Sequence, residues 1–365
     1  MRNIRNILAI AVILLLIAVS ISGCTSPTPA ASPTPAPSAT PGAQKTVTIT
    51  DYRGKEITVP YPTTRVVFLV ENAMNTMYAV GGKDAIVGIG DIWMPQYKEA
   101  FFRAVDPGYD SKLRVASKDG AVDLESLAKT NPQLVVLWSA DWDDKDTKAI
   151  EETLKVPVYG VFLDSFSDLD KLQTDFAKII GNDARGRQAN DQMNAEIKKI
   201  TDVSKTIPEG QKPTVYWMWG DIYGTAGLNS TANDLINAAG GVNVLSKWDN
   251  NTKYDEHPVL TMEAIAALNP DVIYMWYNDK LSPQDVMTGA DFQAWRNLNA
   301  VKNGRVYELD DPFMYDFMTA RLPVAMMKVA KDINPETFKS WDLNKEYDAY
   351  FVEMYGVHYP GFAKA

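Results

Sequence analysis

The sequence is poor in the residues that build disulfides and metal centres. Among its 365 residues there is one cysteine, Cys24, and there are two histidines, His257 and His358. One cysteine cannot close a disulfide within the chain, and two histidines cannot form a histidine-rich zinc site. The formal net charge of −10 has the wrong sign for a surface that binds nucleic acid. We therefore expect neither a disulfide scaffold, nor a resident zinc ion, nor a nucleic-acid partner.

Long apolar runs are also scarce. The run of membrane-like character, Ile7–Ile21, follows Arg2 and Arg5 and leads into Ser22-Gly23-Cys24. A positive start, a short apolar stretch and small residues before a cleavage point are typical of a signal peptide. No second run in the sequence reaches membrane length, so the body of the protein is not itself a channel.

The segment Ile21-Ser22-Gly23-Cys24 resembles the lipobox of exported lipoproteins, which implies that cleavage frees Cys24 for lipid attachment. An uncleaved signal anchor and a chance buried cysteine are the alternatives. Residues 25–44 contain no charged and no large apolar residue, and they are rich in proline and threonine. Such a segment cannot bury enough surface to fold, so we predict an extended tether. The resemblance and the tether together predict that the protein is extracytoplasmic and is held on the outer face of the cell membrane through its lipid alone.

The rest of the chain contains an internal repeat. Residues 122–138, VDLESLAKTNPQLVVLW, align without a gap with residues 260–276, LTMEAIAALNPDVIYMW. Each copy predicts a short helix that Asn-Pro ends, followed by a continuously apolar strand. Looser similarity continues on both sides, as in RVVFLV at 65–70 and TVYWMW at 214–219. Alternating strands and helices predict parallel α/β units, and the duplication predicts two of them.

The predicted divisions are a signal peptide (1–23), a lipid-anchored linker (24–44), an N-terminal lobe (45–182), an interdomain helix (183–209), a C-terminal lobe (210–345) and a C-terminal extension (346–365). The helix follows from apolar residues at helical spacing between Gly181 and Pro208. The predicted fold class is α/β, with two Rossmann-like lobes that have parallel sheets, are joined by one long helix and enclose a ligand cleft. A single rigid helix limits the opening of such a hinge.

This order of elements resembles the substrate-binding lipoproteins of ABC importers, in the subgroup with one interdomain helix that serves siderophore, haem and cobalamin uptake. The resemblance runs from VTITDYRGKEITVPYPTTRVV at 47–67, through both repeat copies, to WRNLNAVKNGRVYELD at 295–310. Gln133 departs from the aspartate that the family usually has after the proline, whereas the second copy keeps Asp271.

The resemblance implies a binding protein rather than an enzyme. Its implied ligand is a metal chelate, namely a ferric siderophore, a corrinoid or haem, which it delivers to a membrane permease and its ATPase. We expect a monomer with no intrinsic cofactor. Free oxyanions such as molybdate fit less well, because an aromatic cleft does not replace their hydration.

The resemblance also gives a role to the glutamates that occupy matching positions in the two repeat copies. It implies that Glu125 and Glu263 dock onto arginines of the permease, one from each lobe. The alternative is that each glutamate is an acid in the first turn of a helix, where the helix dipole favours it.

Ligands of open parallel sheets lie beyond the carboxyl ends of the strands, and here the loops after the predicted strands are rich in aromatic residues. The candidate ligand-binding residues are Glu71, Asn72, Trp93, Trp138 and Asp141 in the first lobe and Trp219, Tyr223, Trp276, Tyr277 and Arg321 in the second. Facing aromatic rings suit a flat or bulky ligand, although packing on the sheet is the alternative for some of them. Arg321 is expected to pair with ligand carboxylates or with the aspartates of 310–316.

Phenol, carboxylate and imidazole groups lie together in Lys253–His257, which makes Tyr254 and His257 candidate ligands for a metal. Because consecutive side chains rarely all point one way, a surface loop is the alternative. Two other functions remain open. An extracytoplasmic metal-dependent hydrolase would use cleft aspartates as acid and base, but the sequence shows neither a paired-carboxylate motif nor a metal-ligand motif. A ligand sensor would present its closed form to a membrane receptor.

Overall fold

In the computed structural model the chain divides into two compact units, residues 1–43 and 44–365. The structure describes residues 45–90, 99–115, 122–139, 144–276 and 280–361. The signal peptide, Cys24 and the linker therefore lie outside the described residues. Among the helices that are described, none is long and apolar enough to cross a membrane.

The N-terminal lobe is built on a five-stranded parallel sheet with strand order β5-β4-β3-β6-β7. Its strands are β3 (Val66–Phe68), β4 (Ile86–Ile89), β5 (Leu113–Arg114), β6 (Leu134–Trp138) and β7 (Val158–Val161). Its helices are α1 (Glu71–Ala79), α2 (Ala100–Val105), α3 (Leu124–Lys129), α4 (Lys145–Thr153) and α5 (Phe166–Ile180), with 3-10 helices η1 (Lys83–Ala85) and η2 (Tyr109–Ser111). An antiparallel hairpin of β1 (Thr46–Thr50) and β2 (Glu56–Pro60) precedes them.

The C-terminal lobe has a four-stranded parallel sheet with strand order β11-β10-β8-β9. Its strands are β8 (Thr214–Trp219), β9 (Val242–Asn243), β10 (Val272–Trp276) and β11 (Val306–Leu309). Its helices are α7 (Thr231–Ala238), α8 (Met262–Leu268), α9 (Pro283–Thr288), α10 (Asn299–Lys302) and α11 (Leu322–Ile333), with 3-10 helices η3 (Glu209–Gln211), η4 (Val244–Lys247), η5 (Asn251–Tyr254) and η6 (Ala290–Asn297). The predicted α/β class, with a parallel sheet in each of two lobes, is confirmed.

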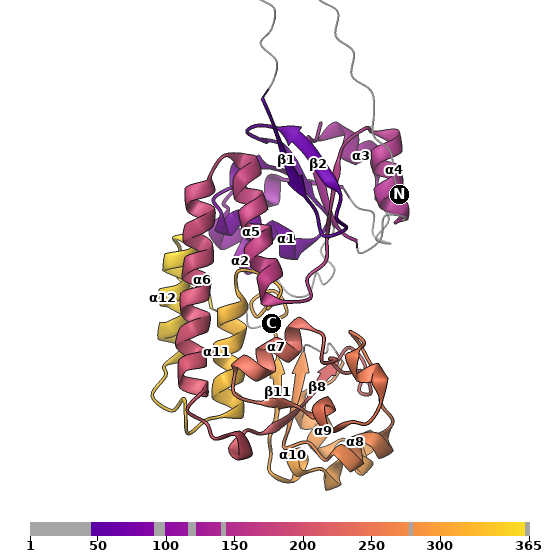
Figure 1. Cartoon of the computed structure of the whole chain (residues 1–365), viewed down its shortest axis with the longest axis vertical. Helices are drawn as coiled ribbons and strands as arrows, with labels where there is room; N and C mark the ends of the chain where they lie inside the picture. Colours follow the sequence, from indigo (N-terminus) through magenta and orange to yellow (C-terminus); the bar gives the residue numbers. More distant parts are fainter. Residues whose placement is uncertain (1–44, 91–98, 116–121, 140–143, 277–279, 362–365) are drawn as a thin grey trace, which may run out of the picture. The chain divides into compact units, whose positions relative to one another are not determined.

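A 22-residue helix, α6 (Asp183–Ser204), connects the two lobes. It begins two residues after Gly181, whose φ of 77° is in the left-handed region that ends the preceding helix. Two later helices, α11 and α12 (Leu343–Tyr355), pack beside α6 (Figure 1). An ion pair of 2.6 Å between Lys199 and Glu346 also joins α6 to α12.

The two repeat copies fold alike. The helices α3 and α8 begin after the capping residues Asp123 and Thr261, each of which accepts a hydrogen bond from the first turn. Each helix then ends near an asparagine in the left-handed region, Asn131 with φ 48° and Asn269 with φ 43°. Asparagine tolerates this conformation better than most residues do. The repeat is therefore a structural unit of helix, turn and strand, present once in each lobe.

The largest buried apolar cluster is shared between the lobes. It includes side chains of α1 and α5 from the first lobe, of α7 and α11 from the second, and of the connecting helix α6. Smaller clusters cover the other face of each sheet. The lobes are thus packed on one another beside α6, while the carboxyl ends of their strands remain available for a site.

Candidate functional site

Aromatic side chains gather at the carboxyl ends of β8 and β10. Trp219 and Trp276 end these strands as direct neighbours across the sheet, with ring centroids 4.5 Å apart. The His257 imidazole lies 4.6 Å from Trp219, and Phe317 lies edge-on to both indoles at 5.9 and 5.6 Å. We call Trp219, His257, Trp276 and Phe317 the aromatic shelf. Both indoles are only partly buried, so they can contact a flat ligand.

Strand position separates the shelf residues from core residues of the same type. Trp217 lies two residues before Trp219 and therefore on the same face of β8. It is fully buried and is stacked on Tyr274 of β10 at 5.3 Å with an interplanar angle of 9°. Along β8 and β10 the aromatic rings are therefore buried at Trp217 and Tyr274, and they become partly exposed at the strand ends, at Trp219 and Trp276.

The first lobe places an equivalent tryptophan at its own sheet edge. Trp138 ends β6 as Trp276 ends β10 in the second repeat copy, and 37% of its surface is exposed. Its ring lies 5.5 Å from Phe162. Glu71 and Asn72 begin α1 two residues after β3, so they also lie at the carboxyl edge of this sheet.

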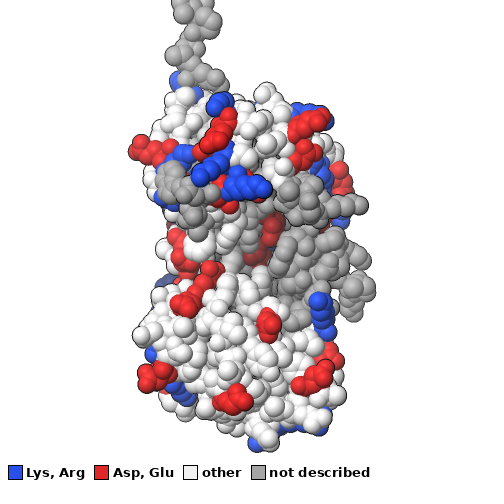
Figure 2. Space-filling model, turned by 90° about the vertical axis from the view of Figure 1, so that its right-hand side faces the viewer, with Lys and Arg blue, Asp and Glu red and all other residues white. Residues whose placement is uncertain are grey.

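Carboxylates accompany these aromatic rings. Burial raises the pKa of Asp164 in the first lobe, with smaller contributions from the charges of Glu256 in the second lobe and of Asp168. Glu256 also lies 3.3 Å from His257 of the aromatic shelf. Figure 2 shows one face of the protein, on which acidic side chains lie within and beside a recess. The site is therefore aromatic and acidic.

Asn72 and Arg321 both contact Asp316. The Asn72 amide donates a hydrogen bond of 2.9 Å to Asp316, and a guanidinium nitrogen of Arg321 lies 3.7 Å from the same carboxylate. Arg321 is completely buried. Of the two partners considered for Arg321, ligand carboxylates or the aspartates of 310–316, this conformation pairs it with an aspartate. In this conformation Arg321 has no exposed surface with which to contact a ligand.

The remaining candidate ligand residues lie apart from the aromatic shelf or outside the described residues. Tyr223 packs 6.3 Å from Trp295, in the cluster that covers the other face of the second sheet. Trp93, Asp141 and Tyr277 lie outside the described residues.

The two candidate metal ligands have different surroundings. His257 belongs to the aromatic shelf, whereas Tyr254 is 51% exposed and its ring is covered by the ammonium group of Lys253 at 5.4 Å. Within the described ranges, no group of three or more His, Cys, Asp or Glu side chains is arranged to hold a metal ion. Only the position of His257 therefore suits contact with a ligand on the shelf.

Two aromatic residues of the site were not predicted from the sequence. Phe162 follows β7 directly, and Phe317 lies in the segment between β11 and α11. The rule that ligands lie beyond the carboxyl ends of strands identifies both segments. It does not predict which residue of a long loop contacts the ligand.

The paired glutamates are exposed at equivalent positions. Glu125 and Glu263 are the second residues of α3 and α8. Glu125 forms an exposed 2.8 Å ion pair with Lys129, one turn along its helix. Hydrogen bonds from its own backbone N–H and from Thr261 lower the pKa of Glu263. Both a docking role and a helix-dipole role are compatible with this geometry.

Comparisons with known proteins agree with this architecture. A profile of the periplasmic binding protein family matches residues 66–313. The chain is 25% identical over 338 residues to an uncharacterized ABC transporter substrate-binding lipoprotein, YvrC of Bacillus subtilis, and the alignment covers 89% of this chain and 96% of that protein. It is also 26% identical over 265 residues to a cobalamin-binding protein of Halobacterium salinarum, covering 71% and 67% of the two chains.

A solved structure has the same fold. Helicobacter pylori CeuE with Ni(II) bound superimposes with a TM-score of 0.69 at 22% identity, over 86% of this chain and 97% of that one. The fold, the family profile and the relatives therefore agree. The chain belongs to the periplasmic binding protein family, as its resemblance to the substrate-binding proteins of ABC importers implied.

Proposed function

We propose that the protein is the substrate-binding component of an ABC importer and that it captures a metal chelate on the aromatic shelf. The observation that carries the proposal is the pairing of Trp219 and Trp276 at adjacent strand ends, with His257 against them. A buried aromatic side chain removes roughly 150–250 Å² from water, at about 25 cal/mol per Å². Because both indoles are already partly buried, a flat ligand that covers their remaining exposed surface gains part of this free energy from the shelf.

The charges beside the shelf narrow the class of ligand. Asp164 and Glu256 lie near it, and the Arg321 guanidinium is buried. Carboxylates oppose an anionic ligand and favour a neutral or cationic one. A corrinoid fits these charges better than a haem with ionised propionates, a polyanionic ferric siderophore or molybdate. The Halobacterium salinarum relative, which is named a cobalamin-binding protein, supports the same choice.

His257 is our candidate for direct contact with the chelated metal. Imidazole is a suitable ligand for cobalt and iron, and the ring already lies on the aromatic surface that would hold the chelate. Tyr254 is less suitable because Lys253 covers its ring.

The remainder of the proposal concerns location and partners. Cys24 would carry the lipid, residues 25–44 would form the tether, and Glu125 and Glu263 would register the monomer on the permease, whose ATPase drives uptake. The Bacillus subtilis relative is named an ABC transporter substrate-binding lipoprotein, which favours transport over hydrolysis. Genes for a permease and an ATPase next to this one would favour transport over sensing.

The direct test is a binding panel on the full chain, with tryptophan fluorescence as the signal. The probes are cyanocobalamin, haemin, a ferric hydroxamate and molybdate. We expect saturable binding of cyanocobalamin and a loss of affinity of about tenfold or more in Trp219→Ala, as for other central aromatic contacts. Trp341→Ala is the matched control, because Trp341 packs on Phe338 away from the shelf. Unchanged affinity in Trp219→Ala, or binding of molybdate alone, would contradict the proposal.

A further inference from the structure

A cluster of buried and half-buried polar side chains joins the lobes on the side of the connecting helix. It consists of Asn72 and Asn75 from α1 in the first lobe, Asp316 and Arg321 from the segment after β11 in the second, and Tyr355 at the end of α12. We call these five residues the interlobe latch. The hydrogen bond between Asn72 and Asp316 connects positions 244 residues apart in the chain.

Arg321 extends from the second lobe into the first. Its guanidinium lies 4.1 Å from the centroid of the Phe101 ring of α2. With the Asn75 amide oriented by its partners, its oxygen accepts hydrogen bonds of 2.9 and 3.2 Å from Arg321, and its nitrogen donates one of 3.0 Å to the Tyr355 hydroxyl. A fully buried charged side chain is tolerated only where hydrogen-bond acceptors and opposite charges surround it.

The C-terminal helix holds the same region from outside. Tyr355 packs 5.0 Å and Phe351 5.9 Å from the Phe101 ring. Arg185 of α6 donates a hydrogen bond to the Met354 carbonyl. The helix α12 thus contacts α1, α2 and α6, although it follows the last strand of both sheets in the chain.

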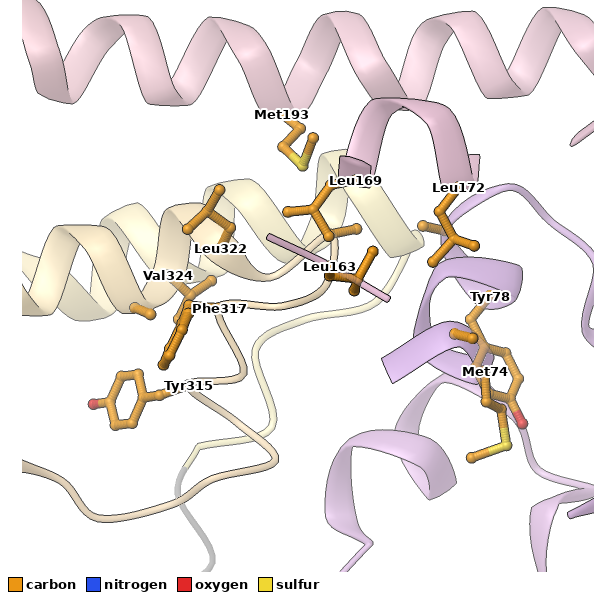
Figure 3. Packing of buried hydrophobic residues seen from close by; sticks show 14 of the residues in the cluster. Met74, Tyr78, Leu163, Leu169, Leu172, Met193, Tyr315, Phe317, Leu322 and Val324 are labelled. Atoms are coloured by element: carbon orange, nitrogen blue, oxygen red, sulfur yellow. The ribbon is translucent and has the colours of Figure 1, made fainter. Parts of the chain in front are cut away.

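The lobes also contact each other near the start of α5, through a hydrogen bond and a shared apolar core. The Thr231 hydroxyl at the start of α7 donates a buried hydrogen bond of 3.2 Å to the Leu163 carbonyl of the first lobe. Figure 3 shows Leu163 and Leu169 of the first lobe with Met193 of α6 and with Phe317 and Leu322 of the second lobe in one apolar cluster. Among the described residues, polar contacts therefore join the lobes both at the latch and at Thr231, with apolar packing between them.

We propose that the interlobe latch sets the separation of the two lobes and limits the opening of the ligand site. The latch lies next to the site, because Asn72 follows Glu71 at the edge of the first sheet. Resting on the proposed function, the inference adds that a weaker latch releases the chelate faster. The latch itself does not depend on the identity of the ligand and is tested in protein to which no ligand has been added.

The choice of variants follows from the charges that meet at the latch. Asp316, Glu71 and Asp311 all interact with the single guanidinium of Arg321. Replacing Arg321 would leave three carboxylates with no cation among the latch residues, which is strongly destabilising for a buried ion pair. Asn72→Ala and Tyr355→Phe each remove one hydrogen-bonding group and no charge. Their exposed counterparts, Asn303→Ala and Tyr61→Phe, are the controls.

The experiment measures lobe separation by fluorescence energy transfer in the full chain without ligand. Cys24→Ser removes the one native cysteine, and Glu152→Cys on α4 with Lys302→Cys on α10 supply one exposed label site in each lobe. We expect Asn72→Ala and Tyr355→Phe to lower the mean transfer efficiency and to broaden its distribution, with neither change in the controls. The dissociation rate of cyanocobalamin should rise several-fold in Tyr355→Phe, which removes one partly buried hydrogen bond of the latch and alters no candidate ligand-binding residue.

Two outcomes distinguish the latch from the proposed function. If both variants show the same transfer efficiency as the labelled protein with an intact latch, the latch does not set the lobe separation. This conclusion does not depend on which ligand the protein binds. A changed lobe separation in a protein that binds no chelate would support the latch and contradict the proposed function instead. Hydrogen exchange of α1, which should become several-fold faster in both variants if they fold and open, checks that the labels themselves do not cause the change.

Discussion

At the scale of single residues, position along a strand decides what a tryptophan does. Trp217 and Trp219 share one face of β8, yet the first is a core residue and the second reaches the aromatic shelf. The sequence predicted the candidates at strand ends, because an apolar run followed by polar residues marks where a buried strand stops. It could not predict Phe317, which reaches the shelf from a connection eight residues after Leu309, the last residue of β11.

This distinction gives a prediction that separates stability from binding. Trp217→Ala should lower the free energy of unfolding by about 3–5 kcal/mol, as expected for a large side chain removed from a packed core. Trp276→Ala should cost less stability but weaken chelate binding, and Trp138→Ala should also weaken it. Urea denaturation and ligand titration of the three variants check this. Equal loss of stability in Trp217→Ala and Trp276→Ala would contradict it.

Asp316 gives a prediction about pH. Burial raises its pKa from 3.8 to about 7, against the opposing charge of Arg321. Between these pH values the folded protein holds a proton that the unfolded chain has lost, so this residue makes the free energy of unfolding decrease as pH rises from about 4 to about 7. Asp316→Asn should remove that part of the decrease.

Urea denaturation at a series of pH values measures this effect. Asp202→Asn is the control, because Asp202 is exposed and Lys198 lowers its pKa, so its titration falls below the same pH window. A pH dependence in Asp316→Asn identical to that of the unmodified protein would show that the residue does not titrate as stated.

At the scale of elements, the repeat is the part that sequence predicts best. The helix, the Asn-Pro stop and the apolar strand of each copy appear as α3 with β6 and as α8 with β10. Local patterns suffice here because each element is determined by residues within a few positions. The two asparagines also explain why the stop works, since both lie in the left-handed region that ends a helix.

The turn at Asn131 can be tested without touching the site. Its side chain is exposed and its φ is 48°. Asn131→Gly should leave the free energy of unfolding within about 0.5 kcal/mol, whereas Asn131→Val should lower it by about 1–2 kcal/mol, because a β-branched residue is strained there. Thermal or urea denaturation of the pair compares them, and equal stability of the two variants would contradict the argument.

The matched glutamates of α3 and α8 give a prediction about partners. Glu125→Arg with Glu263→Arg should leave chelate affinity unchanged and abolish uptake by cells, because both positions are exposed and remain candidate contacts of the permease. Affinity measured on the purified variant and transport measured in cells give the two readouts. Lost affinity would mean that the residues are structural, and normal uptake would mean that the permease does not need them.

At the scale of the whole protein, the long-range contacts were beyond sequence-based prediction. The hydrogen bond between Asn72 and Asp316, like the packing of α12 on α1 and α6, joins residues that no local pattern relates. Arg321 illustrates the result. The sequence offered the aspartates of 310–316 as one of two possible partners, and Arg321 lies beside one of them, Asp316. Its complete burial between the lobes follows only from how the two α/β units pack.

The central claim is that the aromatic shelf binds a metal chelate, and competitive equilibrium dialysis tests it most directly. The full chain is dialysed against an equimolar mixture of cyanocobalamin, haemin, a ferric hydroxamate and molybdate, and the metals retained with the protein are quantified by mass spectrometry. We predict about one cobalt per chain in the unmodified protein and its loss in the Trp219→Ala, Trp276→Ala double variant. Retained molybdenum, or cobalt retained equally by the double variant, would contradict the account.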